Sequence, residues 1–144
     1  ILKYPAEKNE TDLELAINLA LEQGCQQVCI VAALGGRLDQ TLGNIGLLML
    51  PALENVDVRL EDGEETVWLI RRQTTVTGNP GDVVSLIPWG GKVSGVKTDG
   101  LEYPLNDETL FPEKTRGISN VLLQVRATVS ITSGVLMCIH TRKE

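Results

Sequence analysis

The chain has 144 residues, among them 13 Lys or Arg and 19 Asp or Glu, which give a formal net charge of −6 at pH 7. This acidic balance argues against nucleic acid as a partner, because binding to a phosphate backbone needs an excess of basic side chains. The length predicts one domain, or two small ones, with a real core. No apolar run is long enough to span a bilayer, so we expect no membrane partner.

The three cysteines exclude two further classes of protein. Cys25, Cys29 and Cys138 form neither a Cys-x-x-Cys pair nor an even disulfide framework. With a single His in the chain, they also make a poor set of zinc ligands. We therefore expect a protein of the reducing cytoplasm.

The first part of the chain predicts a strand followed by a helix. Residues 1–4 have the pattern of a strand already in progress, and we expect an amino-terminal part of the natural protein to precede them. Thr11 and Glu14 have the spacing of a capping box, which marks the start of a helix. Apolar side chains then recur at helical spacing over residues 13–21, and Gly24 is a natural residue to end the helix.

A second strand and helix follow. Residues 28–33 are an unbroken apolar run, which is typical of a strand buried on both faces. A glycine turn comes next, and apolar residues at helical spacing continue to Met49 before Pro51 ends the segment. Residues 3–50 therefore predict a βαβα unit with parallel strands and a right-handed crossover.

Polar residues follow both predicted strands at the same edge of this sheet. Residues 8–12 open the first helix and residues 35–40 open the second. In open α/β sheets, ligands bind at the carboxyl ends of the strands. Glycines let a backbone approach a ligand, a helix amino terminus favours anions, and Arg37 can bind a phosphate with two hydrogen bonds. The alternative interpretation is a plain glycine turn with a surface Arg37 and a helix-capping Asp39.

After Pro51 the apolar period changes from that of helices to that of strands. Short alternating segments are separated by turns such as Asn79-Pro80-Gly81-Asp82, and no helical period of useful length appears after about residue 50. This predicts an antiparallel β-sandwich or barrel. The fold class is thus α/β followed by all-β: a partial parallel α/β sheet domain over residues 1–55 and an antiparallel β-sandwich over residues 56–144.

Five short segments, in this order, resemble the motifs of thiamine pyrophosphokinases of the bacterial type. They are Glu-Lys-Asn-Glu-Thr-Asp (7–12), Gly-Gly-Arg-Leu-Asp-Gln (35–40), Gly-Asp-Val-Val-Ser-Leu-Ile-Pro (81–88), Gly-Val-Lys-Thr-Asp-Gly-Leu-Glu-Tyr-Pro-Leu (95–105) and Thr-Arg-Gly-Ile-Ser-Asn (115–120). The resemblance covers nearly the whole chain and corresponds to the carboxyl-terminal two thirds of the family.

The resemblance implies an enzyme that transfers diphosphate from ATP to thiamine, giving thiamine diphosphate and AMP. It implies Mg²⁺ as cofactor, and a homodimer with active sites at the subunit contact. Residues 1–55 would be the carboxyl-side portion of the nucleotide-binding and catalytic domain, and residues 56–144 the thiamine-binding domain. The family's Asp-x-Asp motif on an earlier βα turn has no counterpart here, so we expect these 144 residues alone to be inactive.

The resemblance also implies roles for single residues. The catalytic residues would be Asp12, Arg37 and Asp39, with Asp12 as the metal ligand. The ATP-binding residues would be Lys8, Thr11, Gly35, Gly36, Arg37 and Gln40. The thiamine-binding residues would be Tyr103, Ser119 and Asn120. These types suit the chemistry, because phosphate transfer needs cations and Mg²⁺-binding carboxylates, and an aromatic face can bind the thiazolium cation.

Other interpretations of the same residues stay open. Tyr103 could be a packed strand residue, and Ser119 with Asn120 could be only a turn between strands. The chain also departs from the common family pattern at Asn9, Gln40 and Val121. Two alternative functions remain: a non-catalytic β-sandwich that binds or regulates, and a related enzyme that transfers diphosphate to a pterin alcohol.

Overall fold

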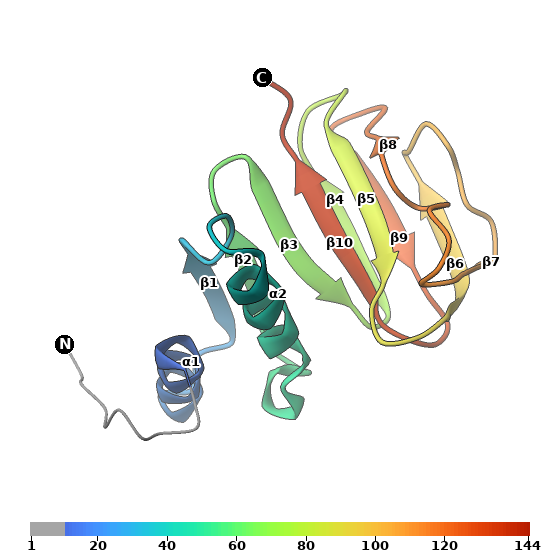
Figure 1. The fold of residues 1–144 in the computed structure, drawn as a ribbon. Helices are drawn as coiled ribbons and strands as arrows, with labels where there is room; N and C mark the ends of the chain where they lie inside the picture. Colours follow the sequence, from blue (N-terminus) through green and yellow to red (C-terminus); the bar gives the residue numbers. More distant parts are fainter. Residues whose placement is uncertain (1–10) are drawn as a thin grey trace. The chain divides into compact units, whose positions relative to one another are not determined.

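The computed structural model describes residues 11–144, so the strand predicted at residues 1–4 and the candidate ATP-binding Lys8 lie outside the described residues. The chain divides into two compact units, Ile1–Leu60 (unit 1) and Glu61–Glu144 (unit 2) (Figure 1). The predicted division falls five residues earlier, between residues 55 and 56. No helix within residues 11–144 is long and apolar enough to cross a membrane.

Unit 1 alternates helices with strands. In chain order its elements are α1 (Asp12–Glu22), β1 (Gln27–Val31), α2 (Leu38–Gly46), the 3-10 helices η1 (Leu47–Met49) and η2 (Pro51–Leu53), and β2 (Asp57–Glu61). β1 and β2 are neighbours in one sheet. The predicted start of α1 is confirmed, because the Glu14 N–H donates to Thr11 Oγ1 at 3.2 Å.

The prediction that the strand at residues 28–33 is buried on both faces is wrong for the described structure. β1 ends at Val31, and of its five residues only Ile30 is buried, while Val31 is 71% exposed. Within residues 11–144, β1 is the end strand of its sheet and has β2 alone beside it. An apolar run indicates that a strand favours a buried position, but the elements packed beside the strand decide whether both of its faces are covered.

Unit 2 is built from antiparallel strands. Its strands are β3 (Glu65–Ile70), β4 (Gln73–Thr77), β5 (Val83–Pro88), β6 (Val93–Asp99), β7 (Glu108–Leu110), β8 (Asn120–Val121), β9 (Arg126–Ser130) and β10 (Leu136–Thr141). One sheet has the order β3-β10-β5-β8 and the other β4-β9-β6-β7, and every pairing given for these strands is antiparallel. No α-helix occurs within residues 61–144, all of which the structure describes. The antiparallel sandwich predicted for this part of the chain is confirmed.

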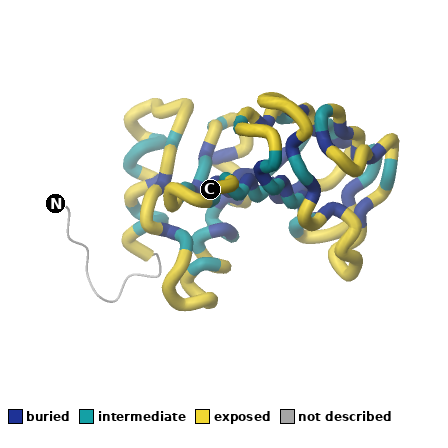
Figure 2. Tube along the Cα trace, turned by 90° about the horizontal axis from the view of Figure 1, so that it is seen from above, coloured by how far each residue is buried: buried dark blue, intermediate teal, exposed yellow. Residues whose placement is uncertain are grey.

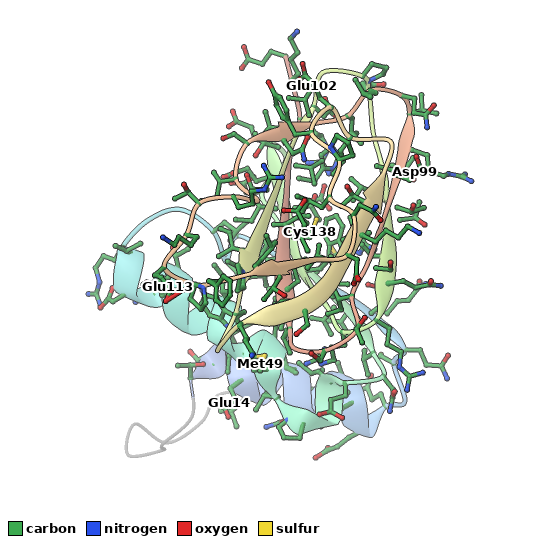
Figure 3. All side chains as sticks on the ribbon, turned by 90° about the vertical axis from the view of Figure 1, so that its right-hand side faces the viewer. Glu14, Met49, Asp99, Glu102, Glu113 and Cys138 are labelled. Atoms are coloured by element: carbon green, nitrogen blue, oxygen red, sulfur yellow. The ribbon has the colours of Figure 1, made fainter. Side chains whose placement is uncertain are left out.

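The core of unit 2 lies between its two sheets. Figure 2 shows buried and more exposed positions interspersed along the chain. In β5 they alternate, and Val84, Leu86 and Pro88 are the buried residues. Residues from both sheets form one hydrophobic cluster, which includes Trp68 and Cys138. Figure 3 shows Cys138 in the interior of this unit, whereas Asp99 and Glu102 lie at its periphery. The alternation in burial therefore marks the inner and outer faces of the sheets.

Candidate functional site

The turn between β1 and α2 contains three residues with a left-handed backbone. Ala32, Gly35 and Gly36 have φ of 61°, 80° and 73°. A Cβ atom added at either glycine would meet no atom within 4 Å. The glycines are thus required by the backbone conformation and not by close packing, and the space beside them is open to a ligand.

Arg37 and Asp39 bond to each other at the start of α2. Arg37 Nε and Nη2 donate to the two carboxylate oxygens of Asp39 at 3.1 and 3.0 Å. Asp39 Oδ1 also accepts from the Gln40 N–H at 2.9 Å. The Arg37 side chain and then this N–H hold the pKa of Asp39 below its ordinary value. Asp39 is not the helix cap, because Arg37 occupies the N-cap position without a side-chain capping bond.

Two further side chains fix the glycine turn, and the sequence analysis gave neither a role. Thr41 Oγ1 lies 3.0 Å from the Gly35 carbonyl oxygen and 3.2 Å from that of Arg37. Asn44 Nδ2 donates to the Ala33 carbonyl oxygen at 3.0 Å. Both come from α2, so the helix holds the turn from which its own amino terminus emerges.

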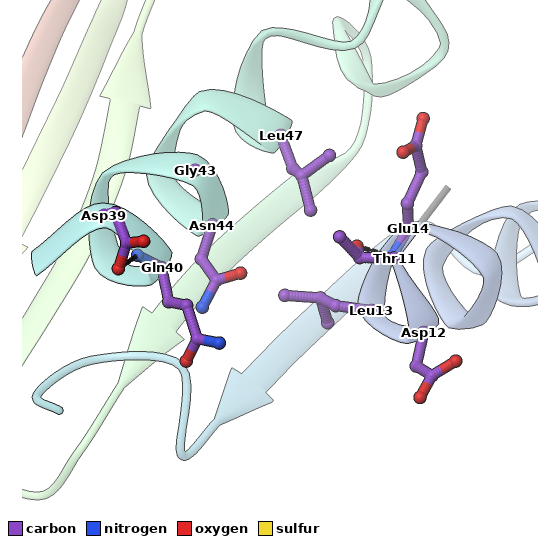
Figure 4. A pocket seen from close by; sticks show the side chains of 9 residues that line it. All are labelled: Thr11, Asp12, Leu13, Glu14, Asp39, Gln40, Gly43, Asn44 and Leu47. Carbon is purple, nitrogen blue, oxygen red and sulfur yellow. Dashed lines mark hydrogen bonds between the residues drawn. The ribbon is translucent and has the colours of Figure 1, made fainter. Parts of the chain in front are cut away.

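A pocket of about 440 Å³ lies between the first turn of α1 and the first half of α2. Its lining residues are Thr11, Asp12, Leu13, Glu14, Asp39, Gln40, Gly43, Asn44 and Leu47 (Figure 4). Four of these are predicted site residues: Thr11, Asp12, Asp39 and Gln40. Arg37 and the two turn glycines do not line the pocket. The structure thus brings together part of the predicted nucleotide site and leaves the Arg37 side chain beside it.

Among residues 11–144, the side chains that line the pocket include three acids and no basic group. Its oxygen donors are of the kind that Mg²⁺ prefers. Within residues 11–144, however, no group of three or more His, Cys, Asp or Glu residues comes together as a metal site. Mg²⁺ is often held by one or two carboxylates together with substrate phosphates, so the donor set fits the use of Asp12 as a single protein ligand.

The three predicted thiamine-binding residues lie close together in unit 2. Asn120 is buried, and its Oδ1 accepts from the Tyr103 N–H at 3.0 Å while its Nδ2 donates to the Tyr103 carbonyl oxygen at 2.7 Å. Asn120 Oδ1 also accepts from the Val121 N–H at 2.9 Å. The amide of Asn120 is therefore engaged with the backbone, and it fixes the segment that carries Tyr103.

Tyr103 and Ser119 are the members of this group that face solvent. Tyr103 is 59% exposed. Ser119 is exposed and has a φ of 63°, and its N–H donates to Ser85 Oγ at 3.0 Å. A left-handed backbone is uncommon for a residue with a side chain, so neighbouring contacts must hold it in place. The structure thus presents an aromatic ring and a hydroxyl on a rigid backbone.

Comparison with known proteins identifies both units. The family model described as "Thiamin pyrophosphokinase, catalytic domain" matches residues 1–60, and the one described as "Thiamin pyrophosphokinase, vitamin B1 binding domain" matches residues 70–136. The chain belongs to the thiamine pyrophosphokinase family. A curated thiamine pyrophosphokinase from Bacillus subtilis is 32% identical over 96% of this chain and 65% of its own length. The chain therefore spans about two thirds of that relative.

Solved structures of the family have the same fold. The crystal structure of thiamine pyrophosphokinase from Bacillus subtilis superposes with a TM-score of 0.88 at 31% identity, over 95% of this chain and 65% of the other. The protein from Geobacillus thermodenitrificans gives 0.83 at 29% identity, over 98% and 66% of the two chains. An α/β portion followed by a β-sandwich is thus the family's architecture for this part of the chain.

Sequence reasoning missed one buried pair in unit 2. His140 Nε2 lies 2.8 Å from Asp82 Oδ2, and both side chains are almost fully buried. In the sequence, Asp82 marks the end of a turn and falls in the motif at residues 81–88, and the single His enters only as a possible zinc ligand. The sequence did hold one indication of this pair. His140 lies two residues after Cys138 in the same strand, so it falls on the same face as this core residue.

Proposed function

We propose that this chain forms the nucleotide-binding and vitamin-binding parts of a thiamine pyrophosphokinase, which transfers diphosphate from ATP to thiamine. The observation that carries the proposal is the pocket of unit 1, which Thr11, Asp12, Asp39 and Gln40 all line. These residues come from two motifs separated in sequence, and the family resemblance assigns all four to the nucleotide and its metal. In this reaction the thiamine hydroxyl oxygen bonds to the β-phosphorus of ATP and gives up its proton to solvent. The bond from that phosphorus to the α–β bridging oxygen breaks, and AMP leaves.

Arg37 is the cation proposed to bind the phosphates. Its Nε and Nη2 already donate to Asp39, and the remaining N–H groups of the guanidinium stay available for phosphate oxygens. Because the pKa of Asp39 is lowered, its carboxylate is a weak base, so we assign to Asp39 the orientation of Arg37 and not the removal of a proton. The left-handed glycines leave open space beside this pair for a phosphate chain.

Mg²⁺ is the cofactor that we propose, with Asp12 as its protein ligand. When bound, it would neutralise phosphate charge during the transfer. Asp12 is the first residue of α1, where the family motif places an acid. Residues 1–144 contain no Asp-x-Asp motif that could supply further metal ligands. We therefore propose that these residues alone do not convert thiamine to its diphosphate.

The proposed vitamin site uses the exposed side chains of unit 2. The Tyr103 ring would stack on the thiazolium cation, and the Ser119 hydroxyl would bond to the pyrimidine. We also propose a homodimer with active sites at the subunit contact, working in the cytoplasm. Exposed apolar side chains of unit 2, such as Leu123 (59%) and Val125 (61%), support a contact surface near this site. Sedimentation of the full-length protein at a dimer mass would agree, and a monomer at micromolar concentration would refute the dimer.

The first test concerns Asp12 in the full-length protein. Asp12→Ala should reduce turnover of thiamine with Mg-ATP by at least about 100-fold, because a metal ligand is lost. Glu22→Ala, at the other end of α1, is the matched control and should leave turnover unchanged. Near-normal rates for Asp12→Ala at saturating Mg²⁺ would show that Asp12 only favours the helix start.

The second test separates the two ligands. Tyr103→Ala should weaken thiamine binding by about 0.5–2 kcal/mol, the range of a cation–π contact, and should leave ATP binding unchanged. Phe111→Ala removes another exposed ring of unit 2 and should affect neither ligand. Calorimetric titrations with each ligand would decide. Equal losses for both ligands would indicate general destabilisation, and thiamine binding without turnover in the full-length protein would favour a non-catalytic binding module.

A further inference from the structure

The Asp82–His140 pair lies at one end of the sandwich of unit 2. Asp82 is 1% exposed and His140 is 5% exposed. Besides His140 Nε2, the carboxylate accepts from the Asn79 N–H at 3.0 Å and from the Lys143 N–H at 2.9 Å. A Cβ atom at Gly78 would lie 2.5 Å from Asp82 Oδ2 and 2.7 Å from His140 Nε2, so only glycine fits against the pair. The pair is enclosed, and its geometry is fixed from several sides.

The ionisation state of the pair follows from its surroundings. Burial raises the pKa of Asp82, but hydrogen bonds from the Lys143 and Asn79 N–H groups, together with His140, lower it by more, and the net pKa lies below the ordinary value. Asp82 is therefore a carboxylate at neutral pH and can only accept hydrogen bonds. It follows that His140 Nε2 carries a hydrogen and donates it to Asp82.

The same turn is bonded through its backbone to a distant segment. The Gly81 N–H donates to the Leu122 carbonyl oxygen, and the Leu122 N–H donates to the Asp82 carbonyl oxygen, both at 2.9 Å. The Gly78 N–H donates to the Val125 carbonyl oxygen at 2.9 Å. The position of residues 122–125 thus depends on the turn that Asp82 closes.

Residues 120–123 are in turn bonded to residues 100–103, and we refer to these two stretches as the paired segments. The Glu102 N–H donates to the Val121 carbonyl oxygen at 2.9 Å, and the Leu123 N–H donates to the Gly100 carbonyl oxygen at 3.0 Å. Leu101 and Leu122 form an antiparallel bridge between them. Asn120 adds its two side-chain bonds to the Tyr103 backbone. The candidate vitamin-binding residues are therefore carried by these segments or directly precede them.

We infer that Asp82 and His140 are positioning residues: the buried pair fixes the turn at residues 78–82, the turn fixes the paired segments, and these set the place of Tyr103 and Ser119. Both side chains are buried, so we expect neither of them to contact the proposed ligand directly. The inference deepens the proposed function and rests on it for the identity of the ligand, thiamine. The chain has a single His, which lies outside the five family motifs, and the inference assigns a role to it.

The test uses the full-length protein with substitutions at His140, since removal of Asp82 leaves several N–H groups without an acceptor and endangers folding. His140→Gln retains an N–H donor of similar reach, and His140→Leu removes it. We expect His140→Leu to weaken thiamine affinity by about tenfold and to leave ATP affinity within twofold of wild type. His140→Gln should restore most of the thiamine affinity. Asp99→Asn, an exposed acid of the same unit, is the control and should change neither affinity.

Amide hydrogen exchange gives a second readout that needs no ligand. In His140→Leu the Leu122 and Tyr103 amides should lose protection by at least tenfold, whereas amides in the middle of β9 should not. Unchanged protection at Leu122, or thiamine affinity unchanged despite lost protection, would overturn the inference. So would an equal loss of ATP and thiamine affinity, which indicates general destabilisation. If wild-type protein binds no thiamine, the proposed function fails, and the exchange measurement alone decides whether the pair fixes the segments.

Discussion

The two candidate sites of this chain are built by hydrogen bonds of very different range along the sequence. In unit 1, Arg37 bonds to Asp39 two residues away, and Thr41 bonds to the carbonyl oxygens of residues four and six positions earlier. In unit 2, Asn120 bonds to Tyr103 over 17 residues, Ser119 to Ser85 over 34 and His140 to Asp82 over 58.

The sites also differ in exposure. The Arg37 and Asp39 side chains are 72% and 69% exposed, whereas those of His140 and Asp82 are 6% and 1% exposed. An exposed pair contributes little to folding and can rearrange around a ligand. A buried pair with a full set of partners fixes one backbone arrangement. We conclude that unit 1 offers adaptable side chains on a local turn, and unit 2 offers exposed side chains on a rigid, long-range frame.

The largest expected difference concerns glycines. A Cβ atom at Gly117, in unit 2, would lie 2.4 Å from the Leu86 carbonyl oxygen, and the Gly117 carbonyl oxygen itself accepts from the Leu86 N–H at 2.8 Å. Because the obstacle is backbone, Gly117→Ala should lower the free energy of unfolding by about 1–3 kcal/mol or more. Urea denaturation followed by circular dichroism would measure this.

Gly46→Ala in unit 1 is the matched control. Gly46 is the last residue of α2, and an added Cβ would meet nothing within 4 Å. Alanine in a helix should stabilise by up to about 1 kcal/mol relative to glycine. A destabilising Gly46→Ala together with a neutral Gly117→Ala would contradict the contrast between the two units.

The next expected effect concerns Asn120. Asn120→Asp keeps the oxygen that accepts from Tyr103 and Val121, but it places a second oxygen where Nδ2 now donates to the Tyr103 carbonyl at 2.7 Å. The lost bond should cost about 1–3 kcal/mol of unfolding free energy, because the carbonyl loses its partner in a buried place. Asn106→Asp, at an exposed position of the same unit, should have no measurable effect. Thermal unfolding of both variants would test this, and equal midpoints would show that the bond is not important.

The same contrast explains what the sequence could predict. The cap at Thr11, the glycine turn and the alternation in β9 are local patterns, and each was predictable because the residues that form the pattern are near one another in the chain. The exposure of Val31 was not predictable, since it depends on what lies beside β1. The cap, the turn and the strands thus follow from neighbouring residues, whereas the burial of a strand's faces follows from tertiary structure.

The candidate residues of unit 2 could be named from the sequence, but their hydrogen-bond partners could not, and thiamine binding by these residues stays a prediction. Family motifs named Tyr103, Ser119 and Asn120, and the structure places them together. No motif indicates that the Asn120 amide is occupied by backbone, or that Asp82 meets His140 across 58 residues. Partners that far apart are joined by strand order, which no local pattern contains.

A smaller expected effect is the response of unit 2 to acid. The folded-state pKa of Asp82 is lowered, so its contribution to stability is fully present above the ordinary aspartate pKa of about 3.9 and is lost as the pH falls through the folded value. Stability of wild type should therefore decrease as the pH falls below about 4. We expect Asp82→Asn to be less stable at neutral pH and to show a shallower decrease. Parallel pH profiles for the two proteins, from urea midpoints between pH 6 and 3, would contradict the assignment.

The smallest expected effect on folding is that of Asp39→Asn in unit 1. The pKa of Asp39 is also lowered, with Arg37 as the main cause, but the pair is exposed to solvent and bonded over two residues only. Its loss should leave the unfolding midpoint unchanged, since solvent screens the attraction and no buried group loses a partner. ATP affinity should still fall by about two- to fivefold, because Arg37 must then be oriented by the ligand itself.

Arg37→Lys is the informative companion variant. It keeps the positive charge but removes the planar guanidinium group, and it should weaken ATP binding at least as much. Calorimetric titration with ATP beside scanning calorimetry would separate the two readouts. A clear drop in the unfolding midpoint for Asp39→Asn would show that the site of unit 1 also belongs to the frame that stabilises its fold, and the contrast with unit 2 would then fail.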